Sequence, residues 1–277
     1  MVILTINRKL SMNDNQNAFN HLDQFASNLP VVASMLLWEI DRNLPVKIKG
    51  YVFEKLIGKG GFSRVFLVSN EKYDTKFCAK VMPKRLQTDN QNDIDFLLHL
   101  EHPNIIRIYD QFENDNMTIC ILEYCPAGSL QDLIKAGQIK KNEQIIFLMQ
   151  QIILGLNFCH SHNIAHRDIK PANILIDRYG RPKLIDFGIS LKIEKGQTIR
   201  EFSCSRSYSA PEVILEQTYD PYKSDLWSLG VTFYCMVVGS MPWPKEPEKV
   251  MISSIEQACY SIPKYTPPIF ARLINSL

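Results

Sequence analysis

Two acids, a lysine and an amide follow one another closely in the second half of the chain, beside short apolar runs. Asp168, Lys170 and Asn173 share one loop, and Asp186 follows soon after. Such a set suits phosphoryl transfer: one carboxylate accepts a hydroxyl proton, an amide and a second carboxylate hold Mg²⁺, and an ammonium neutralises phosphate. Pro171 stiffens the loop because its ring fixes φ. A single loop acid usually only forms a turn, so the ordered set carries the prediction.

The composition is that of a globular protein and argues against several other classes. Hydrophobic residues make up 45% of the 277 residues, and a net charge of +2 favours neither nucleic acid nor an anionic membrane surface. The seven cysteines are odd in number and contain no CxxC pair, which argues against a disulfide framework or a zinc site. The apolar run 229–238 is shorter than the roughly 20 residues that span a bilayer. We expect a cytoplasmic or nuclear protein with no nucleic-acid or membrane partner.

Residues 1–50 differ in pattern from the rest of the chain. The stretch 12–17 is rich in Asn, and 19–40 has apolar positions at near-helical spacing that Pro30 interrupts. We expect a loosely packed leader, partly disordered or with one or two short helices, and prefer this to a docking segment.

From residue 51 the pattern predicts a strand-rich region. The β-rich runs 51–57 and 65–69 flank a glycine-rich tip, 58–64, and so predict a hairpin whose backbone N–H groups can lie over phosphates. The run 77–81 predicts a third strand. Its Lys80 is costly among apolar residues unless it is paired, which favours a functional role.

Two further strands and then helices are predicted beyond residue 104. The runs 105–112 and 117–122 are strand-like, with a polar turn between them. Ser129 can cap a following helix, and 143–162 has too many apolar residues for one narrow face. We therefore expect a buried helix there and a helical second half.

Taken in order, these motifs resemble those of eukaryotic protein kinases over about residues 51–277. The catalytic loop 166–173 is followed at family spacing by Asp-Phe-Gly at 186–188, Ala-Pro-Glu at 210–212 and Asp-Leu-Trp at 225–227. The resemblance implies an α+β, two-lobed kinase fold. It has a five-stranded antiparallel N-lobe with one helix, about 51–123, and a mainly helical C-lobe, about 126–277.

The resemblance also implies roles for the chemistry-bearing residues. Asp168 would act as the base that positions the substrate hydroxyl, while Lys170 and Lys80 would neutralise the phosphates of ATP. Asn173 and Asp186 would hold Mg²⁺. Lys170, two residues after Asp168, is the pattern of serine/threonine kinases.

Adenine would lie between Val65, Ala79 and Leu175, with Leu122 as gatekeeper. Backbone groups of the hinge, residues 123–125, would bond it. The residues implied to surround ATP are Ile57, Gly58, Lys59, Gly60, Gly61, Phe62, Ser63, Arg64, Val65, Ala79, Lys80, Leu122, Glu123, Cys125, Leu175 and Asp186.

Further residues match positions that support catalysis in the family. Ser205 stands where a threonine contacts the catalytic Asp and Lys, and Asp225 would accept bonds from N–H groups of the catalytic loop. Glu201 occupies the usual phosphothreonine position, where its carboxylate would face Arg167. Two sites that select a substrate arginine hold uncharged Ser129 and Ala172. His166 and Phe187 would have packing roles rather than chemical ones.

The chain also departs from the family pattern. Ser63 replaces the third glycine, and Asp93 replaces the longer helix glutamate that pairs with Lys80. The chain stops where further helices are expected, which would leave Glu212 without an arginine and uncover the apolar face of 222–238. We expect a truncated form, or one stabilised by a partner or by its own N-terminal segment.

The sequence thus predicts an ATP- and Mg²⁺-dependent serine/threonine protein kinase with protein substrates. The loop motifs are closest to the calcium/calmodulin-dependent group. The alternative is a non-catalytic kinase-like scaffold, which the departures favour and the complete set of catalytic residues opposes. A metabolite kinase fits less well, because it would lack the Ala-Pro-Glu end and the Asp-Leu-Trp helix.

Overall fold

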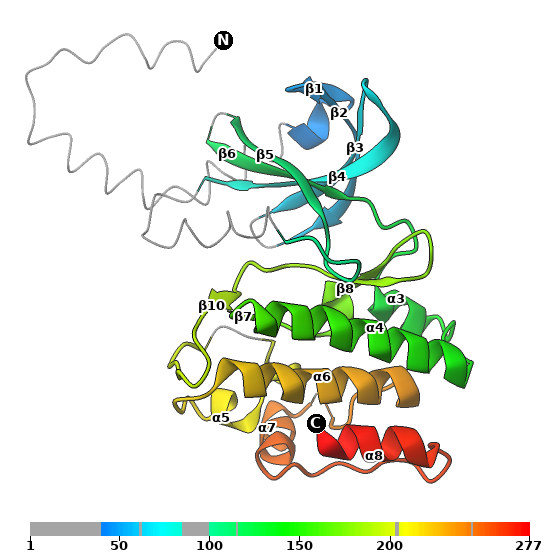
Figure 1. Cartoon of the computed structure of the whole chain (residues 1–277), viewed down its shortest axis with the longest axis vertical. Helices are drawn as coiled ribbons and strands as arrows, with labels where there is room; N and C mark the ends of the chain where they lie inside the picture. Colours follow the sequence, from blue (N-terminus) through cyan, green and yellow to red (C-terminus); the bar gives the residue numbers. More distant parts are fainter. Residues whose placement is uncertain (1–39, 61–62, 85–99, 115, 203–204, 245) are drawn as a thin grey trace, which may run out of the picture. The chain divides into compact units, whose positions relative to one another are not determined.

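The computed structural model describes residues 40–60, 63–84, 100–114, 116–202, 205–244 and 246–277. These residues divide into two compact units (Figure 1). The first unit holds 40–84 and Asp110–Leu122, and the second holds 100–109 and Glu123–Leu277. The predicted lobe boundary placed 100–109 with the strands. These residues belong to the second unit because Ile106 N donates to Leu184 O at 2.9 Å and Leu184 N donates to Asn104 O at 2.8 Å.

A six-stranded sheet with neighbour order β1-β2-β3-β4-β6-β5 builds the first unit. Every second residue in parts of β2, β3, β4 and β6 belongs to one core, which includes fully buried Phe53, Phe66, Ala79, Ile119 and Ile121. The strands are β1 Val46–Ile48, β2 Tyr51–Lys59, β3 Arg64–Asn70, β4 Tyr73–Pro83, β5 Ile108–Asn114 and β6 Met117–Glu123.

The prediction of five strands was one short. The additional strand β1 pairs antiparallel with β2, in the register Val46 to Phe53 and Ile48 to Tyr51. It lies inside the segment 1–50 that was assigned to the leader. A three-residue strand is too short for its alternation to stand out, and only its packing on β2 defines it. The predicted leader helices, the predicted helix of the strand-rich lobe and Asp93 lie outside the described residues.

Helices dominate the second unit, as predicted. Figure 1 shows α4, α6 and α8 stacked one on the next, and their apolar faces share one core with β8 and β9. The helices are α3 Leu130–Lys135, α4 Asn142–Ser161, α5 Pro211–Ile214, α6 Pro221–Val238, α7 Glu248–Glu256 and α8 Pro268–Ser276. The strand pairs are β7 Ile164–Ala165 with β10 Leu191–Lys192, and β8 Ile174–Ile176 with β9 Pro182–Leu184.

Local sequence signals set the ends of two helices. Ser129 caps α3 as predicted, in a reciprocal capping box with Asp132. Asp220 caps α6 by accepting a bond from Tyr222 N at 2.9 Å, and Gly239 ends that helix with a φ of 82°, which glycine adopts without strain.

The apolar face of α6 is covered more fully than predicted. Helix α8 packs on it through Phe270 and Ile274, and Gly230 lets Leu277 approach closely, since a Cβ there would lie 3.1 Å from Leu277 Cβ. The expected uncovering of this face was therefore wrong. Glu212 on α5 is half-buried and makes no ion pair within the described part of the chain. No described helix is both long and apolar enough to cross a membrane.

Candidate active site

The loop between β7 and β8 is held by the buried carboxylate of Asp225 on α6. Asp225 accepts hydrogen bonds from His166 N at 2.8 Å and Arg167 N at 2.7 Å. His160 Nε2 lies 2.9 Å from the same carboxylate. Asp225 is fully buried, so these bonds fix the loop without competition from water. The contacts expected of Asp225 are present.

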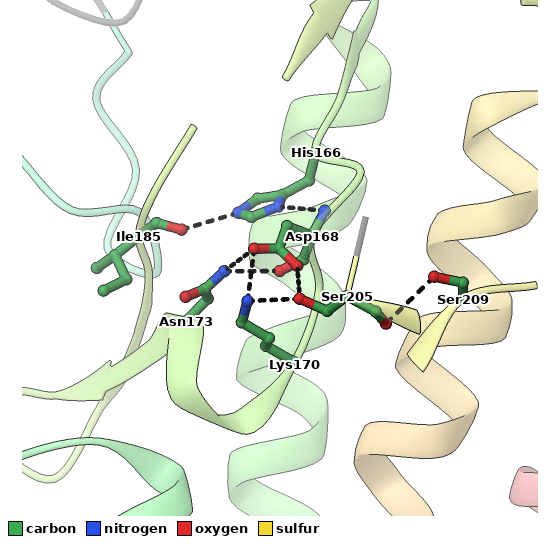
Figure 2. A network of polar contacts seen from close by, with 7 residues as sticks. All are labelled: His166, Asp168, Lys170, Asn173, Ile185, Ser205 and Ser209. Carbon is green, nitrogen blue, oxygen red and sulfur yellow. Dashed lines mark hydrogen bonds and ion pairs between the residues drawn. The ribbon is translucent and has the colours of Figure 1, made fainter. Parts of the chain in front are cut away.

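His166 bonds to the backbone of the loop and of the segment after β9 through its two ring nitrogens. Its Nδ1 accepts a bond from Asp168 N at 3.3 Å, so its Nε2 donates to Ile185 O at 3.0 Å (Figure 2). This pattern requires a neutral ring, and burial lowers the pKa of His166. The ring also packs against Phe187, with centroids 4.7 Å apart. Both residues pack as expected.

Asp168 lies at the centre of a dense polar network. One carboxylate oxygen, Oδ2, accepts bonds from Lys170 Nζ and Asn173 Nδ2, each at 2.7 Å. The other, Oδ1, accepts from Ser205 Oγ at 2.8 Å, and Lys170 Nζ also donates to that hydroxyl at 2.7 Å. Figure 2 shows these side chains converging from the loop and from the segment before α5. The structure thus brings together four residues that the sequence singled out.

Two residues that are expected to hold a divalent cation through oxygen atoms lie nearby in the chain. Asn173 uses its Nδ2 on Asp168, and its amide oxygen points away from that residue (Figure 2). Asp186 follows β9 with a left-handed φ of 64°, and a Cβ on Gly188 would lie 3.4 Å from its carboxylate. No described group of three or more His, Cys, Asp or Glu could hold a metal. An amide oxygen and one carboxylate suit Mg²⁺, which takes its other ligands from phosphates and water.

Arg167 binds through a glutamate to the stretch 189–209, which matches the activation segment of the kinase pattern. Its Nη1 donates to Glu201 Oε2 at 2.9 Å and its Nη2 donates to Glu201 O at 3.1 Å. Tyr219 donates to the same carbonyl at 2.8 Å, and a bridge between Ile199 and Tyr219 holds the backbone beside it. The contact that the hypothesis about Glu201 required is therefore present. The Nε of Arg167 is buried and has no hydrogen-bond partner among the residues that the structure describes.

The hinge is anchored by a residue that the sequence analysis missed. Glu123 N donates to Arg107 O at 2.9 Å, so only its carbonyl can serve a ligand. The carboxylate of Glu123 lies 2.8 Å from Lys183 Nζ. Lys183 precedes Leu184 and Ile185 in an apolar run. Like Lys80, a lysine among apolar residues is costly unless it is paired, and this signal could have identified Lys183 from the sequence. Cys125 is buried.

In the first unit, residues that are predicted to surround ATP lie along three adjacent strands. Lys80 on β4 pairs across the sheet with Val65 on β3, and Val65 in turn faces Gly58 on β2. A Cβ on Gly58 would lie 3.4 Å from Val65, so glycine leaves the space over this strand open. Ala79 is fully buried in the sheet core.

The glycine-rich tip is closed by its own backbone. Gly60 N donates to Ser63 O at 2.9 Å, and Arg64 Nη1 donates to the carbonyls of Gly60 and Ser63. A Cβ on Gly60 would lie 2.6 Å from Ser63 Oγ, so a larger residue here would require the Ser63 hydroxyl to move. Gly61 and Phe62 lie outside the described residues.

The remaining predicted residues lie on strands of the two units. Ile57 and Lys59 end β2, and Leu122 is half-buried near the end of β6. Leu175 lies on β8, in register with Lys183 on β9.

Comparison with known proteins settles the family. A family model described as the protein kinase domain matches residues 51–273. The chain belongs to the protein kinase family. Sperm motility kinase 3A of Mus musculus is 36% identical over 216 residues, covering 77% of this kinase and 43% of the relative. Maternal embryonic leucine zipper kinase of Xenopus tropicalis is 34% identical over 236 residues, covering 83% and 36%. This kinase spans less than half the length of these relatives.

Proposed function

We propose that this kinase is catalytically active and transfers the γ-phosphate of ATP to serine or threonine hydroxyls of proteins. The observation that carries the proposal is the bonding of Asp168. Its carboxylate is held by an ammonium, an amide and a hydroxyl, at 2.7, 2.7 and 2.8 Å. A non-catalytic scaffold has no need to orient a partly exposed carboxylate in this way.

Asp168 is suited to receive the proton of a substrate hydroxyl. Ser205 Oγ already donates to Asp168 Oδ1, so that oxygen accepts a hydroxyl hydrogen bond in this geometry. As the substrate oxygen bonds to the γ-phosphorus, the bond from that phosphorus to the β,γ-bridging oxygen breaks and the hydroxyl proton passes to Asp168. Asp225 keeps the loop in place during the reaction through the bonds to His166 N and Arg167 N.

Lys170 and the two metal-ligand candidates supply charge. Lys170 Nζ is fixed between Asp168 and Ser205, from where its ammonium can neutralise the transferred phosphate. Asn173 and Asp186 would hold Mg²⁺, which when bound offsets the charge of the phosphates. Lys80 would contact the other phosphates. Serine/threonine specificity is supported by the place of Lys170, two residues after Asp168.

A transfer assay tests the proposal. The 1–277 protein is incubated with Mg·ATP labelled at the γ-phosphate and a generic basic protein. Asp186→Asn should lower incorporation by at least ~100-fold, because it removes a metal ligand while keeping the size of the side chain. Asp74→Asn, the same change at an exposed position on β4, should leave incorporation unchanged. Circular dichroism confirms that both variants fold.

The scaffold alternative predicts no incorporation that depends on Asp186. Equal signals from the wild type and Asp186→Asn would therefore overturn the proposal. Analysis of the labelled amino acids tests specificity separately, and label on tyrosine alone would contradict the serine/threonine assignment.

A further inference from the structure

A buried lysine on β9 holds the hinge. Lys183 Nζ lies 2.8 Å from Glu123 Oε2, and the side chains are 7% and 20% exposed. A lysine in such a place is unfavourable unless its charge is paired. Among the described residues, Oε2 has one further hydrogen bond, a long one of 3.5 Å from Arg107 N. The position of the Glu123 carboxylate is therefore set mainly by Lys183.

The strand that carries Lys183 is a firm support. Just before Lys183 in the chain, Pro182 O accepts a bond from Asn104 Nδ2 at 3.0 Å. Just after it, Leu184 N donates to Asn104 O at 2.8 Å and Ile106 N donates to Leu184 O at 2.9 Å. Bonds on both neighbours of Lys183 fix the direction in which its side chain leaves the strand.

The same strand leads directly to the metal-ligand candidate. Ile185 N donates to Asn173 O at 3.0 Å, and Ile185 O accepts from His166 at 3.0 Å. Asp186 is the next residue. One short stretch thus contacts the hinge carboxylate at Lys183 and the catalytic loop at Ile185.

The other charged residues near this pair bond to one another, so Glu123 is the acid that pairs with Lys183. Both residues line a pocket of about 340 Å³ together with His102, Arg107 and Glu101. Arg107 is engaged by Glu101 at 2.7 Å in an exposed pair. Burial and the charge of Lys183 lower the pKa of His102, and its Nδ1 accepts a bond from Asn104 N, which requires that nitrogen to be unprotonated.

We propose that Lys183 is a positioning residue for nucleotide binding. By holding the Glu123 carboxylate on a fixed strand, it sets the backbone of the hinge, whose carbonyl would bond adenine. The inference rests on the proposed function, since it assigns Lys183 a role in the nucleotide site of that enzyme. Lys183 itself would not touch ATP.

Nucleotide affinity tests the inference directly. Lys183→Met keeps the aliphatic length of the side chain but leaves Glu123 without its cation. Calorimetry with Mg·ADP, at a temperature where every variant is fully folded, should show about tenfold weaker binding, equivalent to ~1.4 kcal/mol. The KM for ATP should rise by a similar factor, while the KM for a peptide substrate should change less than about twofold.

Two variants separate positioning from a general effect. Arg107→Met removes a cation from the same pocket but from the exposed pair, and should bind Mg·ADP like the wild type. Lys183→Met combined with Glu123→Gln also lacks the bond that sets the hinge and should bind Mg·ADP no more tightly than Lys183→Met. Recovery of wild-type affinity in the double variant would show that the unpaired charge, and not lost positioning, weakened binding. If Lys183→Met does not fold, Glu123→Gln alone should weaken binding by about threefold.

Each outcome decides the matter. Unchanged affinity in the variant that is measured, or equal weakening in Arg107→Met, would overturn the role of Lys183. A wild-type protein that binds Mg·ADP but transfers no phosphate would refute the proposed function and leave Lys183 to be judged by affinity. A wild-type protein that binds no nucleotide would refute both.

Discussion

Two buried cations of the second unit each hold a glutamate, but the two pairs differ in how far the acid is exposed. Lys183 holds Glu123, whose side chain is 20% exposed, and Arg167 holds Glu201, whose side chain is 65% exposed. Water and salt screen the second pair far more strongly than the first. The Lys183 pair is thus suited to permanent support, and the Arg167 pair to a contact that another anion could replace.

The comparison predicts a large difference in stability. Lys183→Met should lower the free energy of unfolding by roughly 2–4 kcal/mol, because it leaves a largely buried charge unpaired. Glu201→Ala should lower it by only about 1 kcal/mol, because the lost acid is 65% exposed and Arg167 keeps its bonds to Ile189 O and Glu201 O. Denaturant unfolding followed by circular dichroism measures both. Equal losses would show that exposure does not distinguish the two pairs.

Catalytic activity should also depend on Glu201, because this residue holds the activation segment on Arg167. Glu201→Ala should lower basal kcat by about fivefold, since a charge-assisted bond of ~1 kcal/mol no longer holds the segment on Arg167. Glu201→Gln, which keeps the bonding oxygen, should lose less. Initial rates with a peptide substrate give the values.

One result would remove the role assigned to Glu201. If Glu201→Ala is as active as the wild type, and the wild type needs phosphate on Thr198 or Ser203, then the phosphate and not the glutamate supplies the anion. Mass spectrometry of the active protein identifies such a phosphate, which brings more charge than a carboxylate.

The smallest effect is expected for an arginine three residues before the target serine of a peptide substrate, because the acid Asp132 is already bonded to Ser129. Asp132 accepts bonds from Ser129 Oγ at 2.6 Å and Ser129 N at 3.0 Å, and these bonds lower the pKa of its carboxyl group. Ser129 and Ala172, which hold the family's arginine-selecting positions, are uncharged. Replacing arginine by alanine three residues before the target serine should change kcat/KM by less than about threefold. A peptide library dominated by arginine at that place would contradict this alignment.

Local pattern alone was enough for five strands of the first unit, for the helix at 143–162 and for the catalytic loop. The order Asp168, Lys170, Asn173 and Asp186 identifies the family because these residues lie close together in the chain. The Ser129 cap of α3 and the hairpin at Gly60 also depend on neighbours within a few residues. Such features are encoded where they occur, so periodicity and turn chemistry reveal them.

Only the tertiary structure decided how distant residues combine. Arg167 and Glu201 are 34 residues apart, and Arg167 and Asp225 are 58 apart. The Lys183 pair, the strand β1 and the cover of α6 by α8 are likewise fixed by packing. A local window cannot predict such contacts, because each depends on how the intervening chain closes. The sequence by itself thus determined the family and predicted the reacting groups, whereas folding determined which charges hold these groups in place.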